Sequence, residues 1–218
     1  MHGLTKTLSR FLGKRLKAIY YQARESIGDH KRMLVVEQVE QACVGLTETR
    51  DEFADALERF KSLVYVNDSG LEHKYHLLNR QYLFCRAKSD AVSYRIRAIE
   101  EVSEALFAEW ENELDEYSNR VLRNSSKQQL KAARQNYARL IKAMRRAEDK
   151  IKPVLAAFKD QVLYLKHNLN AQAIASLESE LVTLTVGVSA LIKAMERSIE
   201  KANVFMRSMN TQKALPSE

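Results

Sequence analysis

Residues 130–165 read LKAARQNYARLIKAMRRAEDKIKPVLAAFKDQVLYL, and this stretch decides the fold. Its apolar residues recur at alternating steps of three and four, which is the spacing of a heptad repeat. A repeat held over this length predicts a long α-helix in a left-handed coiled-coil bundle. Pro153 lies inside the series and is expected to kink the helix rather than end it. The positions are Leu130, Ala133, Tyr137, Leu140, Met144, Ala147, Ile151, Val154, Phe158 and Leu165.

The same spacing continues on both sides of this stretch. One series covers residues 36–64, with Arg50 as its polar exception, and a second covers residues 71–117. A further series covers residues 174–195. Because the chain has only 6 Gly and 2 Pro among 218 residues, it has little material for turns. The sequence therefore predicts one large all-helical unit with few connections.

Polar interruptions predict where the helices end. Residues 67–70 and 124–126 break the pattern, and each break holds a serine, Ser69 and Ser126, placed as a helix cap with Glu or Gln three residues later. Across residues 167–170 the heptad phase slips, which predicts either a turn or a stutter, so the body has three very long helices or four of about 40 residues. Forty helical residues span about 60 Å. The predicted fold is an all-α, elongated antiparallel coiled-coil bundle shaped as a rod or an arc.

Residues 1–24 form a basic amphipathic stretch. They hold six basic residues and no Asp or Glu, whereas the whole chain holds 35 basic and 28 acidic residues, so almost all of the net charge lies here. A helix with an apolar stripe opposite a cationic face suits the surface of an anionic bilayer. The predicted membrane-inserting residues are Leu4, Leu8, Phe11, Leu12, Leu16 and Ile19. The predicted headgroup-binding residues are Lys6, Arg10, Lys14, Arg15 and Lys17.

These patterns give a leading hypothesis and an alternative. Residues 1–27 are expected to bind anionic membrane, residues 28–208 to form the coiled-coil body, and residues 209–218 to be a disordered tail. The protein is then a peripheral membrane protein that self-associates as a homodimer or larger homo-oligomer and senses, bends or scaffolds the bilayer. Neither a secretion signal nor a membrane span is recognised, which favours peripheral attachment to the cytoplasmic face of a membrane. In the alternative, the N-terminal stripe packs on protein and the chain is a structural scaffold for a protein partner.

Charge is also segregated within the body. Residues 100–116 hold eight acidic residues and no basic ones, and residues 127–166 hold eleven basic residues against three acidic ones. An antiparallel hairpin would lay these segments side by side, so that they neutralise one another. The alternative is a free cationic face for lipid or nucleic acid, with nucleic acid the less favoured partner because no binding motif is present. The residues of this secondary basic face are Lys142, Arg145, Arg146, Lys150 and Lys152.

No pattern indicates catalysis. Glycine-rich phosphate loops, a nucleophile elbow and a zinc signature are absent from the sequence, so no enzyme activity, cofactor, metal or small-molecule substrate is expected. His73 and His76 are one helical turn apart but lack a second ligand pair, which favours a solvated or packed role. Cys43 and Cys85 are widely spaced at apolar positions, which is typical of reduced, packed thiols. Trp110 is expected in the core near the hairpin end.

Three stretches resemble an uncharacterised family of bacterial helical proteins. They are residues 18–32 (AIYYQARESIGDHKR), 105–114 (ALFAEWENEL) and 158–177 (FKDQVLYLKHNLNAQAIASL), and the most specific part is LKHNLNA at 165–171. The resemblance covers nearly everything after residue 18. Members of that family typically begin with a lipoprotein signal whose lipid-bearing Cys lies just ahead of paired tyrosines, where this chain has the basic amphipathic stretch instead. The resemblance implies membrane attachment followed by a coiled-coil body, and it implies no catalytic residues.

The layout of the chain is also similar to two classes of membrane-shaping protein. One is the BAR-domain crescent with an amphipathic N-terminal helix. The other is the class of phage-shock-protein A and ESCRT-III, in which such a helix precedes a long helical hairpin. Both are similarities of architecture, since long coiled coils share their period.

Overall fold

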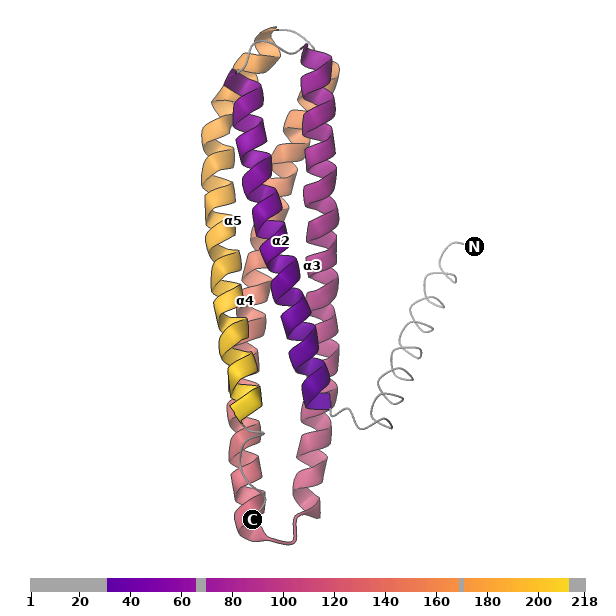
Figure 1. Cartoon of the computed structure of the whole chain (residues 1–218), viewed down its shortest axis with the longest axis vertical. Helices are drawn as coiled ribbons and strands as arrows, with labels where there is room; N and C mark the ends of the chain where they lie inside the picture. Colours follow the sequence, from indigo (N-terminus) through magenta and orange to yellow (C-terminus); the bar gives the residue numbers. More distant parts are fainter. Residues whose placement is uncertain (1–30, 66–69, 169–170, 212–218) are drawn as a thin grey trace, which may run out of the picture.

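Four long helices make up the computed structural model, which describes residues 31–65, 70–168 and 171–211. The described part of the chain contains no β-strand. The predicted all-α, elongated antiparallel bundle is confirmed, with four helices rather than three (Figure 1). The elements are α2 Lys31–Tyr65, α3 Leu71–Glu113, the short 3-10 helix η1 Leu114–Glu116, α4 Arg120–His167 and α5 Ala171–Thr211.

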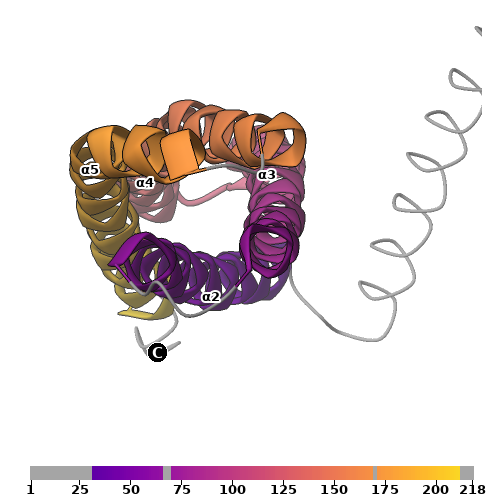
Figure 2. The same cartoon turned by 90° about the horizontal axis from the view of Figure 1, so that it is seen from above.

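The helices run alternately up and down and enclose one core. Helix α2 packs on α3 and α5, and α4 packs on the same two neighbours, so that the bundle is a closed square when seen from its end (Figure 2). The predicted phase slip after residue 166 is a turn, because α4 ends at His167 and α5 begins at Ala171. Helices α3 and α4 extend past the described ends of α2 and α5, and the bundle tapers there to a two-helix hairpin (Figure 1).

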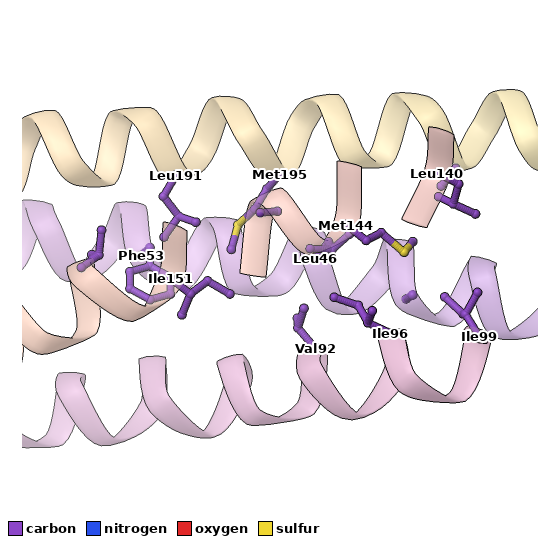
Figure 3. Close-up of a cluster of buried hydrophobic side chains, with 14 of the residues drawn as sticks. Leu46, Phe53, Val92, Ile96, Ile99, Leu140, Met144, Ile151, Leu191 and Met195 are labelled. Atoms are coloured by element: carbon purple, nitrogen blue, oxygen red, sulfur yellow. The ribbon is translucent and has the colours of Figure 1, made fainter. Parts of the chain in front are cut away.

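The core is built from the heptad residues of all four helices. Leu46, Ile96, Met144 and Met195, one from each helix, lie together between the helices and are fully buried (Figure 3). Every position predicted on α4 is buried except Tyr137, which is half-buried. Helix α4 also continues through Pro153 without interruption. Burial of this stripe removes a large apolar area from water and supplies the main stabilisation of the bundle.

In α2 most of the predicted core positions are buried, but at three of them the preceding residue is buried instead: Val35 for Val36, Ala42 for Cys43 and Thr49 for Arg50. Thr49 is fully buried, and Arg50, which the predicted series placed in the core, is only half-buried. The Thr49 hydroxyl donates a hydrogen bond to the Gly45 carbonyl at 2.6 Å, so its burial leaves no unpaired polar group. The guanidinium of Arg50 turns outward to Asp51 at 2.7 Å. The apparent break in the heptads is therefore a polar residue that the core accommodates.

The α3–α4 turn lies at residues 117–119, and its predicted position at residues 124–126 is wrong. Asn119 is the N-cap of α4, and its side-chain oxygen accepts hydrogen bonds from the backbone N–H groups of the second and third helical residues at 2.9 and 3.3 Å. Ser126, the predicted cap, is buried inside α4, where its hydroxyl accepts a hydrogen bond from Trp110 Nε1 at 2.8 Å. Trp110 itself is buried near the hairpin end, as predicted.

The start of α3 also differs from its prediction. Gly70 is the N-cap and makes no side-chain cap hydrogen bond. Ser69, the predicted cap, lies outside the described residues. Because Leu71 is the first helical residue, Glu72 falls one position too early for a capping box but still places an acid in the first turn.

The cap at Asn119 gives a direct test of the turn position. Asn119→Ala is expected to lower the free energy of unfolding by about 1 kcal/mol, because two backbone donors lose their acceptor. Asn124→Ala is the matched control, since Asn124 is exposed within α4 and alanine favours helix there. Urea unfolding of both variants checks the prediction. A larger loss for Asn124→Ala than for Asn119→Ala would contradict it.

Candidate functional site

The predicted membrane-binding residues of the N-terminal stretch, both apolar and basic, lie outside the described residues. The described chain begins with α2, and the start of α2 is at the end of the bundle where the α3–α4 hairpin projects (Figure 1). Residues 1–30 are therefore joined to the rod at this end.

The secondary basic face is narrower than its prediction. Lys142, Arg146 and Lys150 are exposed and follow one another at steps of four, so they form one outer stripe on α4. Lys152 lies 3.8 Å from Asp149, and both of these side chains are well exposed. Such an exposed pair contributes little to stability, and it leaves the four basic side chains facing solvent.

Arg145, the fifth predicted residue of this face, turns toward α3 instead. Its Nε donates a hydrogen bond to Glu100 at 2.9 Å, its Nη2 reaches the second oxygen of the same carboxylate, and its Nη1 donates to Glu148 at 2.6 Å. These bonds raise the pKa of the guanidinium above its ordinary value. Burial alone would raise the pKa of Glu148, but hydrogen bonds from Ser93 and Arg145 hold it below its ordinary value. Arg145 is therefore part of a charged seam that runs along the junction of α3 and α4.

The same seam continues toward the hairpin. Arg134 Nη2 lies 2.6 Å from the Glu111 carboxylate, and Arg123 pairs with Asp115. The hydrogen bond and the charge of Arg134 lower the pKa of Glu111. These contacts confirm that the acidic and basic segments lie side by side, and Arg134 and Arg145 are the residues of the predicted basic run that they pair with α3.

A buried lysine at the other end of the bundle was missed by sequence reasoning. Lys74 is only 2 % exposed, and its Nζ donates to the Leu63 carbonyl at 2.7 Å. This carbonyl belongs to the last turn of α2, where carbonyls lack helical partners and favour a cation. Gln81 is also buried and donates to Glu52. The predicted core residues were the tyrosines one position further along α3, which are half-buried.

The cysteines and histidines show no arrangement typical of a reactive site. Cys43 and Cys85 are free thiols, and burial raises their pKa values to about 11 and about 12. His73 and His76 of α3 are both exposed. The Nε2 atom of His76 lies 3.8 Å from the Glu72 carboxylate. Among the described residues, no group of three or more His, Cys, Asp or Glu side chains is placed to hold a metal ion.

Shallow grooves follow the outside of the bundle in the described part of the chain. One follows α3 and α4 near the hairpin and is lined by Lys127, Lys131 and the Arg134–Glu111 pair. The other follows α2 and α5 beside Met206. Both are open to solvent and have charged rims. None of the described helices combines the length and apolar character that crossing a membrane requires.

Comparison with known proteins gives a family and no closer relative. The curated proteins and the solved structures yielded no match. A family model described as "Protein of unknown function (DUF2959)" matches residues 20–209, which include almost all of the four-helix bundle. The match begins after the predicted membrane-inserting and headgroup-binding residues. Because it covers most of the chain, this protein belongs to the DUF2959 family, a family of unknown function.

Proposed function

We propose that this protein binds anionic membranes peripherally through residues 1–27 and holds a four-helix rod at the bilayer from one end. The observation that carries the proposal is the distribution of positive charge. Beyond residue 24, the chain holds 29 basic residues against 28 acidic ones, and Arg134 and Arg145 of α4 are paired with acidic residues of α3. The first 24 residues, in contrast, hold six basic residues and no acidic one, with apolar residues at helical spacing. This is the composition of an interfacial helix.

The proposed attachment is weak for a single chain and is strengthened by assembly. Each basic residue near an anionic surface contributes about 1 kcal/mol, and the apolar side chains add their burial in the interface. Several rods held together multiply this attachment, because the second anchor binds at high effective concentration. An assembly of this kind supports a role in scaffolding or bending the bilayer, and the proposal includes no catalytic step.

A structural scaffold that binds a protein partner is the second candidate. The family match favours it, since that match begins at residue 20 and leaves out every residue predicted to insert. Large apolar side chains on the outside of the bundle, among them Val182 and Val186 of α5, also favour a protein partner. In this alternative, deletion of residues 1–20 leaves localisation and assembly unchanged.

Liposome co-sedimentation separates the two candidates. The full chain is expected to pellet with anionic vesicles and much less with neutral ones, and a chain lacking residues 1–20 is expected to stay in the supernatant. A triple variant that changes Leu8, Leu12 and Leu16 to glutamine keeps every charge and is expected to lose most binding, because insertion supplies the apolar contribution. Equal binding by the full and the truncated chain would contradict the proposal.

The control uses the basic stripe of the bundle. Changing Lys142, Arg146 and Lys150 to glutamine removes three exposed positive charges from α4, and binding is expected to stay close to that of the unchanged chain. Changing Lys6, Arg10 and Lys14 removes the same number from the N-terminal stretch and is expected to weaken binding. If the α4 variant lost more liposome binding than the N-terminal variant, the lipid contact would be assigned to the bundle instead.

A further inference from the structure

The groove between α3 and α4 near the hairpin combines buried apolar side chains with exposed basic ones. Leu114 and Leu130 are its buried apolar lining, and Lys127 and Lys131 are exposed along it. The two lysines are four residues apart, so they lie on the same face of α4. Neither makes an ion pair with a residue that the structure describes. The groove therefore offers two ammonium groups to an anionic ligand.

Among the described residues that line the groove, the acidic one, Glu111, is already neutralised. Its carboxylate lies 2.6 Å from Arg134, whose guanidinium is also held over the ring of Phe107, 5.8 Å from the centroid. Glu113 lies on another face of α3, because side chains two residues apart on a helix do not face each other. Glu104 lies two helical turns further from the hairpin than Glu111. The net charge of the groove is therefore positive, and the two lysines supply it.

The groove lies at the level where residues 1–30 join the rod. The guanidinium of Arg32, in the first turn of α2, lies 4.8 Å from the centroid of the Trp110 ring. Trp110 donates a hydrogen bond to Ser126, the residue before Lys127. The start of α2 is therefore beside the projecting hairpin and close to the groove (Figure 1). A bilayer that holds the chain ahead of α2 lies near the groove as well.

We propose that this groove binds the phosphate of an anionic phospholipid at the bilayer surface, as a second lipid contact of the rod. The contact depends on the proposed attachment of residues 1–27, which brings the groove to the bilayer. Two ammonium groups one helical turn apart suit a phosphate, because each can donate to a different oxygen. Lys127 and Lys131 are thereby given a ligand of the charge that the groove lacks.

The tip of the hairpin adds apolar contact to the same end. Val121 and Leu122, at the start of α4, are 75 % and 55 % exposed, and Arg120 before them is exposed too. Apolar side chains beside basic ones suit the boundary between headgroups and acyl chains. Two lysines near an anionic surface strengthen binding by roughly tenfold to thirtyfold, which is too little to hold the chain alone. A chain that lacks residues 1–20 is therefore still expected to stay in the supernatant.

Trp110 is the reporter for this contact, because it is the one tryptophan of the chain and is bonded to Ser126 beside the groove. The full chain is added to anionic vesicles that carry a spin label on a phospholipid headgroup, and tryptophan fluorescence is recorded. The bound chain is expected to be quenched, since the groove holds headgroups close to this ring. Quenching reports where the hairpin lies, whereas co-sedimentation reports only how much protein binds.

A double variant that changes Lys127 and Lys131 to glutamine tests the two ammonium groups. It is expected to bind anionic vesicles about tenfold more weakly and to show less quenching per bound chain. The matched control changes Lys142 and Lys150 to glutamine, which removes the same charge from exposed positions of α4. Lys142 lies roughly 20 Å along the helix from Lys127, so the control is expected to behave like the unchanged chain. Circular dichroism of both variants checks that the helices are retained.

The results separate the groove contact from the attachment of residues 1–27. A chain that binds the vesicles while Trp110 stays unquenched overturns the groove contact and leaves the N-terminal attachment in place. Equal binding and equal quenching by the two double variants also overturn it. If the unchanged chain fails to pellet with anionic vesicles, the proposed attachment fails and the groove contact fails with it, and co-sedimentation shows this result before any fluorescence is measured.

Discussion

Replacing Phe158 by alanine is expected to lower the free energy of unfolding by about 3–5 kcal/mol. Phe158 of α4 is only 1 % exposed. Its ring centroid lies 6.4 Å from that of Phe53 and 6.2 Å from that of Phe60, both of α2. Helices α2 and α4 are diagonal to each other in the square, so this ring fills the centre of the bundle. Because the surrounding helices relax only in part, truncation of the ring is expected to leave a cavity.

Urea unfolding measures the loss. The dependence of the free energy on urea concentration is expected to stay the same, because the substitution hardly changes the surface area exposed on unfolding. Leu163→Ala is the matched control. Leu163 is on the same helix but 43 % exposed, so its truncation is expected to change the free energy of unfolding by less than about 0.5 kcal/mol. Similar losses for both variants would show that the aromatic cluster does not fill the centre of the core.

The success of the heptad prediction differed between helices for a physical reason. On α4 every predicted seam position is apolar, so only one choice of face buries them together. On α3 the buried positions include Lys74 and Gln81, and each is followed by a half-buried tyrosine. The lysine and the glutamine find their partners on α2, Leu63 and Glu52, which are near them only in the folded chain. Local patterning therefore favoured the tyrosines and missed these contacts.

The predicted position of the α3–α4 turn is wrong because a cluster of poor helix formers indicates a turn more strongly than a single capping residue does. Residues 124–126, Asn-Ser-Ser, are three poor helix formers in a row, whereas Asn119 stands nearly alone. Yet a single side chain suffices to cap α4, and Ser126 is retained inside the helix because its hydroxyl accepts from Trp110, sixteen residues away. The contact that decides this boundary is a tertiary one.

For the charged surfaces, the sequence predicts which segments are acidic or basic better than it predicts which of their side chains are exposed. The pairing of acidic with basic segments followed from their order along the chain, but which arginine faces α3 did not, since Arg145 and Arg146 are neighbours of the same type.

Replacing Arg145 by alanine is expected to lower the free energy of unfolding by about 2 kcal/mol at pH 7, since two carboxylates lose their shared counter-ion. The side chains of Glu100 and Glu148 are 29 % and 13 % exposed, so solvent compensates only in part. Arg146→Ala is the matched control, because Arg146 is the exposed neighbour. A double-mutant cycle with Glu100→Gln isolates the pairing energy from the loss of the arginine stem.

The pH dependence of this loss distinguishes charge from packing. The pKa of Glu148 is depressed in the folded protein, so its stabilisation is present above its unfolded pKa of about 4.3 and is lost as the pH falls through the folded value. The difference between the unchanged chain and Arg145→Ala is therefore expected to be full at pH 7 and to shrink below about pH 4. A difference that persists at lower pH would assign the loss to packing of the arginine stem.

Because the guanidinium is engaged with α3, Arg145→Ala is also expected to leave liposome binding unchanged. Weaker liposome binding by this variant would indicate that Arg145 contacts lipid.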